Sequence, residues 1–573
     1  MRSPLYTFTK RTKIIFGLFI MTAAVFVFRL YQLQIMLGDH YRERVDKMYL
    51  VTPDKEFERG SILFTTRENY QVPAASTKHG TKVAIKPNIV KNPETFYEQV
   101  NNALEIDKDF FMKKAQKNED PYEEIFFKLD DVDVEKLRSI ETEEHIEYHR
   151  ESWRVYPQNQ MAAQTIGFVA YDENTLKGQY GLERQYEESL RRISTKKKSL
   201  FADLLTSFSS TVSPGLFNEG DLVTTMDLSS QRELVQVLNK IQKKWDSSMT
   251  GGIIMNPKTG AVIAMESLPS FNPNQRTNED IAYFKNPIVE NLYEMGSIMK
   301  PLIVAGALDS GNITEDFKYN DTGSIVIQDR TIYNFDKKGR GPNTGLETIL
   351  SDSLNTGMVL IEKEMGHQTT KDYLEKLKLR GKTDIDLPNE ATGLTNNMDT
   401  LGDVEYANIS FGQGIAITPI AMARALATLA NGGSISTPYI GDFIAYPEGS
   451  QKDLAPELIE NRVFSKQAVE KVSEMLVYSV DNVLGNGKYK NEHYSVAAKT
   501  GTAQIPNNQE GGYYTDRNLH TFFGYFPARD PEYLVFLYTM HPKGVRFSSQ
   551  TLAEPFFSLT DFLINYYHVP PDR

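Results

Sequence analysis

Gly296-Ser297-Ile298-Met299-Lys300-Pro301 is the stretch that decides the fold of this 573-residue chain. Two further short motifs follow it, first Ser353-Leu354-Asn355 and then Lys499-Thr500-Gly501-Thr502. Each of these motifs alone can occur by chance in a chain of this length. In this order, and with apolar segments around each, the patterns S-x-x-K, S-x-N and K-T-G are typical of enzymes in which a serine attacks a peptide-like carbonyl.

The first motif supplies a nucleophile and a candidate base. A serine hydroxyl needs a base within hydrogen-bond reach, and residues three apart share one face of a helix, which places Lys300 beside Ser297. The apolar run 302–308 predicts a buried helix that begins near Gly296, with Ser297 in its first turn. The helix dipole and burial both favour a neutral Lys300, which can act as the base. The alternative is an ordinary buried helix start with an incidental serine and lysine.

The second motif lies between the apolar ends of two helical patterns. In a loop that faces the nucleophile, the hydroxyl of Ser353 can relay a proton, and the amide of Asn355 can hold a substrate carbonyl or orient Lys300. The alternative is a helix cap, because Ser and Asn are favoured there for their local hydrogen bonds.

The third motif reads as a strand with small residues. We expect Gly501 to let a substrate backbone approach closely, because a strand edge can accept a peptide as an added strand. Lys499 and the hydroxyls of Thr500 and Thr502 suit a terminal carboxylate. The backbone N–H groups of Thr502 and Ser297 could form an oxyanion hole. The alternative is an exposed polar strand end.

These motifs and stretches through nearly the whole chain resemble the class B penicillin-binding proteins, the membrane-anchored monofunctional peptidoglycan transpeptidases. The resemblance implies an α/β (mixed α+β) fold, with a penicillin-binding/serine β-lactamase-like transpeptidase domain on an elongated α+β pedestal. The other stretches that carry the likeness are Arg29-Leu30-Tyr31-Gln32-Leu33-Gln34-Ile35, Arg59-Gly60-Ser61-Ile62, Tyr156-Pro157, Ile166-Gly167-Phe168-Val169, Gly181-Leu182-Glu183, Thr224-Thr225-Met226-Asp227, Ile385-Asp386-Leu387-Pro388, Phe411-Gly412-Gln413-Gly414, Thr418-Pro419 and Gly524-Tyr525-Phe526-Pro527-Ala528.

The chain departs from the family's pattern at three places. Residues 63–68 stand where the family usually has an Asp-Arg-Asn-Gly run, Met295 where proline is usual, and Ala498 where glycine is common. None of these changes removes a proposed catalytic group. They bear on the pedestal and on drug affinity more than on the reaction.

The resemblance implies a D,D-transpeptidase that cross-links peptidoglycan outside the cytoplasmic membrane. Ser297 would attack the penultimate D-alanyl carbonyl of a stem peptide, and an amine from a neighbouring strand would resolve the acyl-enzyme. β-Lactams would bind the same serine. The family also implies contacts with a SEDS-family glycan polymerase and other division proteins.

Several alternatives remain open. Within the fold, these are an elongation-type transpeptidase, a β-lactamase or a D,D-carboxypeptidase. Glu294, two places before Gly296, favours the septal branch over the elongation branch. In a different class, the chain could be a catalytically idle scaffold of the cell-wall machinery, although the intact motifs argue against this.

Composition limits the possibilities further. The length requires two or more folded units. The net charge of −12 argues against a nucleic-acid surface, and the lack of cysteine excludes a disulfide framework or a thiolate site. His145 and His149 superficially resemble a zinc helix. The alternation from Ile146 to Arg154 predicts a strand instead, in which residues four apart stand roughly 13 Å from each other, so we expect no metal and no cofactor.

The N-terminus predicts a retained membrane anchor. Four basic residues precede an apolar run over 14–28, and the segment continues to residue 36 so that it can cross a bilayer. A cleaved signal peptide is the alternative, but no convincing cleavage site follows. We therefore expect a single-pass protein with an extracytoplasmic catalytic domain. Its parts are a cytoplasmic tail at 1–13, an anchor at 14–36, a pedestal at 37–222 and a transpeptidase domain at 223–573. Strand-like runs on either side of residues 256–260 predict a hairpin early in that last domain.

Overall fold

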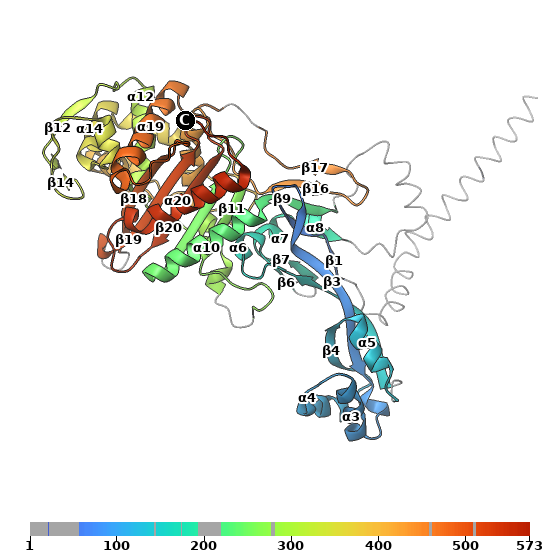
Figure 1. The fold of residues 1–573 in the computed structure, drawn as a ribbon. Coiled ribbons are helices and arrows are strands. Elements are labelled where there is room, and N and C mark those ends of the chain that lie inside the picture. Colours follow the sequence, from blue (N-terminus) through green and yellow to red (C-terminus); the bar gives the residue numbers. More distant parts are fainter. Residues whose placement is uncertain are drawn as a thin grey trace, which may run out of the picture. The chain divides into compact units, whose positions relative to one another are not determined.

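The computed structural model describes Met21 and residues 57–573, apart from 118, 142–144, 173–174, 193–218, 277–280, 401, 458–460 and 508–510 (Figure 1). The predicted tail and, except for Met21, the predicted anchor therefore lie outside the described residues. Within the described part of the chain, no helix is both long and apolar enough to cross a membrane.

The chain forms two compact units. The smaller contains His79–Ser152, and the larger contains Phe57–Lys78 with Trp153–Arg573. The larger unit includes residues on both sides of the predicted boundary at residue 222, which stays a prediction.

The smaller unit packs three helices against strands. The end of β3 (Gln71–Ile85) pairs antiparallel with β4 (Glu123–Leu129), and β3 also pairs with β5 (Ile146–Val155). The predicted strand at Ile146 is thus confirmed. An Asn or Asp side chain accepts a backbone hydrogen bond at each helix start, which satisfies an otherwise unpaired N–H. The helices are α3 (Pro93–Ala103), α4 (Lys108–Ala115) and α5 (Asp131–Arg138), with the 3-10 turn η2 (Pro87–Ile89).

A five-stranded antiparallel sheet is the centre of the larger unit (Figure 1). Its order is β11-β10-β20-β19-β18, so β18 is an edge strand. The predicted hairpin around residues 256–260 is confirmed as the pair β10 and β11. The strands are β10 (Met249–Met255), β11 (Val262–Leu268), β18 (Ala497–Pro506), β19 (Tyr513–Phe526) and β20 (Tyr533–Met540).

Two long helices, α10 (Leu228–Trp245) and α20 (Ser548–Tyr567), cover one face of this sheet (Figure 1). In α10 the apolar residues recur at helical spacing, and Asp227 caps its start by accepting a hydrogen bond from the N–H of Ser230 at 2.7 Å. The buried cluster on this face includes Leu234, Val237, Ile241, Phe522, Leu537, Leu552, Phe556 and Leu559.

The opposite face carries a helical layer around α12 (Lys300–Asp309), whose residues from Lys300 to Ala307 are all buried. A helix that is apolar all round is expected at the centre of such a layer. The other helices and turns of the larger unit are α6 (Ala163–Ile166), α7 (Gly181–Gln185), α8 (Glu187–Leu190), η4 (Ile281–Phe284), α11 (Pro287–Glu290), η5 (Gly296–Met299), α13 (Leu346–Ser351), α14 (Asn355–Met365), α15 (His367–Lys376), α16 (Asn397–Thr400), α17 (Asp403–Ile409), α18 (Pro419–Ala430), α19 (Lys466–Tyr478), the π-helical η6 (Ser479–Val483) and η7 (Leu484–Gly487).

Short strands complete the larger unit. β9 pairs parallel with β2 and antiparallel with β16, and β16 continues to β17. Separate two-stranded pairs are β1 with β8, β6 with β7, β12 with β15, and β13 with β14. The bounds are β1 (Glu58–Arg59), β2 (Ile62–Thr65), β6 (Val169–Asp172), β7 (Thr175–Gly178), β8 (Arg191–Arg192), β9 (Asp221–Asp227), β12 (Lys318–Asp321), β13 (Ser324–Ile327), β14 (Arg330–Tyr333), β15 (Gly341–Gly345), β16 (Gly441–Ala445) and β17 (Gln451–Asp453).

A buried ion cluster gathers three of the stretches that carry the family likeness. The carboxylate of Glu183 accepts from Arg59 Nε at 2.6 Å and from Arg154 Nε at 2.7 Å, and all three side chains are buried. The hydroxyl of Tyr156 donates to the same carboxylate at 3.3 Å. Residues far apart in the sequence are thus held together by charge-assisted hydrogen bonds.

Candidate active site

Ser297 lies in the 3-10 turn η5, one step before the α-helix. The backbone N–H of Lys300 donates to the carbonyl of Ser297, and α12 begins at Lys300. The sequence prediction placed Ser297 in the first turn of that helix. Pro301 explains the difference, because it has no N–H to give the carbonyl of Ser297 an α-helical partner, and the shorter 3-10 bond takes its place.

Gly296 allows this turn to pack directly on the sheet. Its φ is 66°, and a Cβ there would lie 3.1 Å from the carbonyl oxygen of Thr502. The N–H of Gly296 donates to the carbonyl of Gly412 at 3.0 Å, and the hydroxyl of Thr521 donates to the carbonyl of Met295 at 3.1 Å. The turn that carries Ser297 is therefore held by hydrogen bonds from both sides.

Lys300 is fully buried, with 0 % of its surface exposed. Its Nζ lies 2.7 Å from the carbonyl oxygen of Ser353 and 2.8 Å from Oδ1 of Asn355. Burial, together with the positive charge of Lys499, holds the pKa of Lys300 well below its ordinary value. A neutral amine can donate to these two oxygens and keep a lone pair to accept a proton. Ser297 Oγ and Lys300 Nζ share no hydrogen bond, although both residues are described.

Ser353 Oγ stands between the two lysines. It lies 3.3 Å from Nζ of Lys300 and 3.1 Å from Nζ of Lys499. Lys499 is 3 % exposed, and burial lowers its pKa to about 7. Ser353 has a φ of 55°, in the connection between α13 and α14, and this conformation turns its carbonyl and hydroxyl toward Lys300.

The helix-cap alternative for the second motif is wrong. Leu354 is the N-cap residue of α14 and makes no side-chain cap. The orphan N–H groups of Asn355 and Thr356 instead donate to Oδ1 of Asn334, at 3.0 and 3.2 Å. Asn334 in turn donates to the buried carboxylate of Asp321. The side chain of Asn355 is thus free to face Lys300.

Sequence reasoning missed Asn334. It lies 21 residues before Asn355, in a stretch without a motif, so no spacing pattern could reveal it. Two aromatic residues, Phe335 and Phe547, were missed for the same reason. Both line the cleft, and their ring centroids lie 5.5 Å apart.

The third motif lies along the free edge of β18, as expected for a strand that could accept a peptide. The role predicted for Gly501 in substrate approach stays a prediction, and the structure shows a further need for its small size. A Cβ there would lie 2.3 Å from Oγ1 of Thr521 and 3.1 Å from the carbonyl oxygen of Met295. The small size of Gly501 therefore lets the turn that carries Ser297 pack against β18. Thr502 accepts a hydrogen bond from the N–H of Ser548 at 3.3 Å.

A cleft of about 920 Å³ brings most of the predicted residues together. Lys300 and Gly501 lie behind its wall. Ser297, Ser353, Asn355, Lys499, Thr500 and Thr502 all line it, with Tyr333, Phe335, Phe411, Gln413, Arg546 and Phe547 among the other lining residues.

Two family models match the chain. The penicillin binding protein transpeptidase domain matches residues 250–559, and the penicillin-binding protein dimerisation domain matches residues 55–203. The chain belongs to the penicillin-binding protein transpeptidases. Together the two models confirm the predicted class B resemblance, and the family is one of cell-wall transpeptidases.

Curated relatives and solved structures agree. The chain is 28% identical to stage V sporulation protein D of Bacillus subtilis, over 94% of this chain and 83% of the relative. It is 31% identical to a peptidoglycan D,D-transpeptidase FtsI homolog of Mesostigma viride, over 75% of each. Penicillin binding protein 2X of Streptococcus thermophilus has the same fold, with a TM-score of 0.74 at 20% identity over 90% of this chain and 81% of that one. Penicillin binding protein 3 of Mycobacterium tuberculosis, solved with aztreonam, gives a TM-score of 0.68 at 22% identity over 90% and 98%.

Proposed function

We propose that this peptidoglycan transpeptidase works through an acyl-serine intermediate on Ser297. The observation that carries the proposal is the burial of Lys300, whose Nζ is held by Ser353 and Asn355 and has no carboxylate partner among the described residues. A lysine that is neutral at working pH can take the serine proton, and one that kept its full charge could not.

The steps follow from this arrangement. Ser297 Oγ attacks the penultimate D-alanyl carbonyl of a stem peptide, and its proton passes to Lys300. The backbone N–H groups of Ser297 and Thr502 stabilise the oxyanion. The C–N bond then breaks, and the hydroxyl of Ser353, hydrogen-bonded to both lysines, passes a proton to the leaving D-alanine nitrogen.

Deacylation reverses these roles. An acceptor amine from a second strand attacks the ester carbonyl and gives up a proton, and the ester bond to Ser297 breaks as its oxygen regains one. Lys499, with the hydroxyls of Thr500 and Thr502, holds the terminal carboxylate of the donor in the first half of the reaction. A bound carboxylate also favours the charged form of Lys499.

β-Lactams are the inhibitors that this site would take, because they present a strained amide and a carboxylate to the same groups. Related structures carry aztreonam and ampicillin, which supports the proposal. An idle scaffold of the same fold is less consistent with the site, since it needs no buried lysine of lowered pKa that the described residues leave without a carboxylate partner.

The test is the rate of acylation by a fluorescent penicillin in Lys300→Ala. Loss of the base should slow labelling by roughly 10² to 10⁴. The matched control is Lys337→Ala, which removes an exposed lysine from the rim of the same cleft. Equal labelling rates in the wild type and Lys300→Ala would rule out Lys300 as the base.

The cellular setting extends the proposal. A single-pass anchor at 14–36, an extracytoplasmic catalytic domain and contacts with a SEDS-family polymerase and other division proteins are supported by the apolar run after the basic tail and by the family resemblance. Glu294 supports a septal role. A fluorescent fusion that lines the side wall and is not concentrated at midcell would contradict that assignment.

A further inference from the structure

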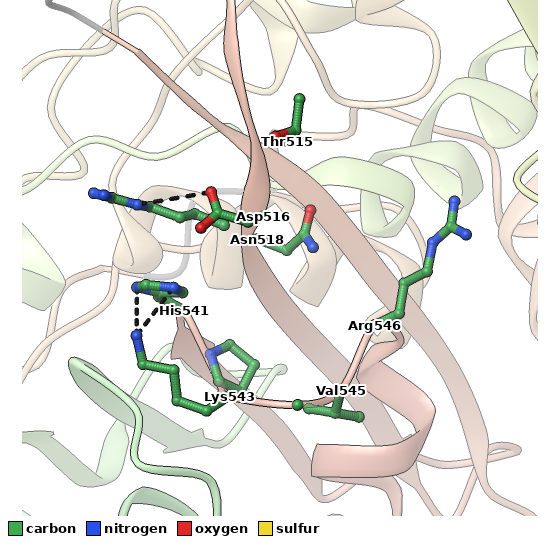
Figure 2. Close-up of a pocket in the computed structure, with 10 residues that line it drawn as sticks. Thr515, Asp516, Asn518, His541, Lys543, Val545 and Arg546 are labelled. Carbon is green, nitrogen blue, oxygen red and sulfur yellow. Dashed lines mark hydrogen bonds and ion pairs between the residues drawn. The ribbon is translucent and has the colours of Figure 1, made fainter.

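A second, basic groove adjoins the catalytic cleft. Residues 515–518 of β19 and residues 541–546 of the loop between β20 and α20 line it, with a volume of about 580 Å³ (Figure 2). We call this hollow the β19 groove. It shares Thr515, Asn518 and Arg546 with the catalytic cleft, so the two hollows are continuous at these residues.

Backbone contacts fix the loop that forms one wall of the groove. The N–H of His541 donates to the carbonyl of Asn518 at 2.8 Å, and that of Lys543 donates to the carbonyl of Trp245 at 2.7 Å. The carbonyl of Arg546 accepts from Nε2 of His520 at 3.1 Å. His520 is fully buried, and burial lowers its pKa to about 4, so the ring is neutral and its Nε2 carries the proton. These hydrogen bonds therefore hold the loop in place as one wall of the groove.

The cations of the groove differ in what they contact. Arg517 lies 3.9 Å from Asp516, and Lys543 donates to the ring of His541 (Figure 2). The guanidinium of Arg546 lies over the ring of Phe547 at 5.4 Å and makes no hydrogen bond or ion pair to the described residues. Arg546 is thus an exposed cation at the junction of the two hollows, and its donors are unpaired among the described residues.

The edge of β18 runs toward the part of the groove that Arg546 lines. The proposed terminal carboxylate of the donor lies at Lys499 and Thr502, so the rest of an extended peptide runs toward Gln504, about 7 Å further along at 3.4 Å per residue. Gln504 is the register partner of Asn518, which lines both hollows. A side chain about two residues from the reacting D-alanine would therefore lie near the junction of the two hollows, which Arg546 also lines.

We propose that Arg546 binds a carboxylate carried by a side chain of the stem peptide that lies along β18. The inference rests on the proposed function and deepens it, because it makes the enzyme selective for anionic over amidated stem peptides. The planar fork of arginine suits a carboxylate, and the stacking on Phe547 orients it. A phosphate-bearing wall polymer is less favoured, since among the described cations of the β19 groove Arg517 and Lys543 already have partners, which leaves Arg546 beside a peptide-binding edge.

The test compares two synthetic D-alanyl-D-alanine peptides that differ only in a carboxylate or an amide on the residue two places before the cleaved bond. D-Alanine release by the purified full chain gives kcat/KM for each. The wild type should prefer the carboxylate by about fivefold. Arg546→Gln should bring this ratio close to one, and Arg546→Lys should retain part of it. The matched control is Arg330→Gln, an exposed arginine on β14 that lines neither hollow, and it should keep the ratio.

Binding of the same peptides to Ser297→Ala, measured by calorimetry, separates this site from the chemistry. A carboxylate preference that Arg546→Gln removes would support the site even if turnover failed. Equal affinity for both peptides would overturn the proposal. So would binding of a glycerol-phosphate oligomer that depends on Arg546 without any preference between the peptides, because it would assign the groove to an anionic polymer.

Discussion

Lys300 and Lys499 contact the same hydroxyl, because their Nζ atoms lie 3.3 and 3.1 Å from Oγ of Ser353. Both lysines are buried and have no carboxylate partner among the described residues, and the charge of Lys499 adds to burial in lowering the pKa of Lys300. This shared contact couples the proposed base to the proposed carboxylate-binding residue, and proton movement between them would need only the serine.

Removal of Lys499 should shift the pH dependence of acylation. The charge of Lys499 adds to burial in lowering the pKa of Lys300, so Lys499→Met should raise that pKa and move the acid limb of the profile to higher pH. The measurement is the acylation rate from pH 5 to 9 with an uncharged activated ester. Lys337→Met, at the exposed rim, is the control. An unmoved acid limb in Lys499→Met would show that the two lysines are not coupled.

Thr502→Val should weaken recognition of the terminal carboxylate of the substrate. The change keeps the volume of the side chain but removes the hydroxyl that faces the cleft. We expect about a tenfold loss in acylation efficiency for a penicillin with a free carboxylate, and a smaller loss for its methyl ester. Parallel measurements of the two ligands give the answer. The same loss for both would remove Thr502 from carboxylate recognition.

Glu183→Gln should destabilise the larger unit. Burial alone would raise the pKa of Glu183, but Arg154 and Arg59 hold it below its ordinary value, so the carboxylate is charged. Its removal leaves buried Arg154 without a carboxylate partner among the described residues and leaves Arg59 with Glu187 alone, at a cost of about 3 to 5 kcal/mol. Urea denaturation followed by circular dichroism measures this. Glu187→Gln, which removes a more exposed partner of Arg59, should cost less, and an equal cost would contradict a special role for Glu183.

His367 should stabilise the helical layer most at low pH. Burial opposes its charge, but hydrogen bonds to Glu362 and Asp403, at 2.7 and 2.9 Å, raise its pKa. The stabilisation is fully present below the unfolded pKa of about 6.5 and is lost as the pH rises through the raised folded value. His367→Gln should thus lower Tm more at pH 5.5 than at pH 8.5. The free energy of unfolding lost at pH 5.5 should exceed that lost at pH 8.5 by up to about 1 kcal/mol. A cost that is independent of pH would show that the ring acts by packing alone.

Much of the site could be predicted from the sequence because its chemistry is concentrated in three short motifs. Spacing alone could place Lys300 near Ser297 and could give Lys499 a strand beside them. It could not reveal the 3-10 turn, which depends on Pro301 removing one hydrogen bond. It also could not reveal that Gly501 is packed against Thr521, which lies on another strand.

Long-range contacts account for the rest. Asn334 completes the start of α14 from a different part of the chain, and the resemblance marked Arg59 and Glu183 without showing that they pair with each other and with Arg154. Arg546 has no motif around it, and its position matters only because β18 and the loop before α20 meet. Such side chains become visible only when the fold brings their partners together.

The most direct test of the account is the location of a covalent penicillin adduct. The full chain should gain the mass of one benzylpenicillin, and peptide mapping should place it on the peptide that contains Ser297. Ser297→Ala should melt at the same temperature as the wild type and gain no mass, because one hydroxyl is lost at a preformed site. An adduct on any other serine, or one that persists in Ser297→Ala, would contradict the central claim that Ser297 is the nucleophile.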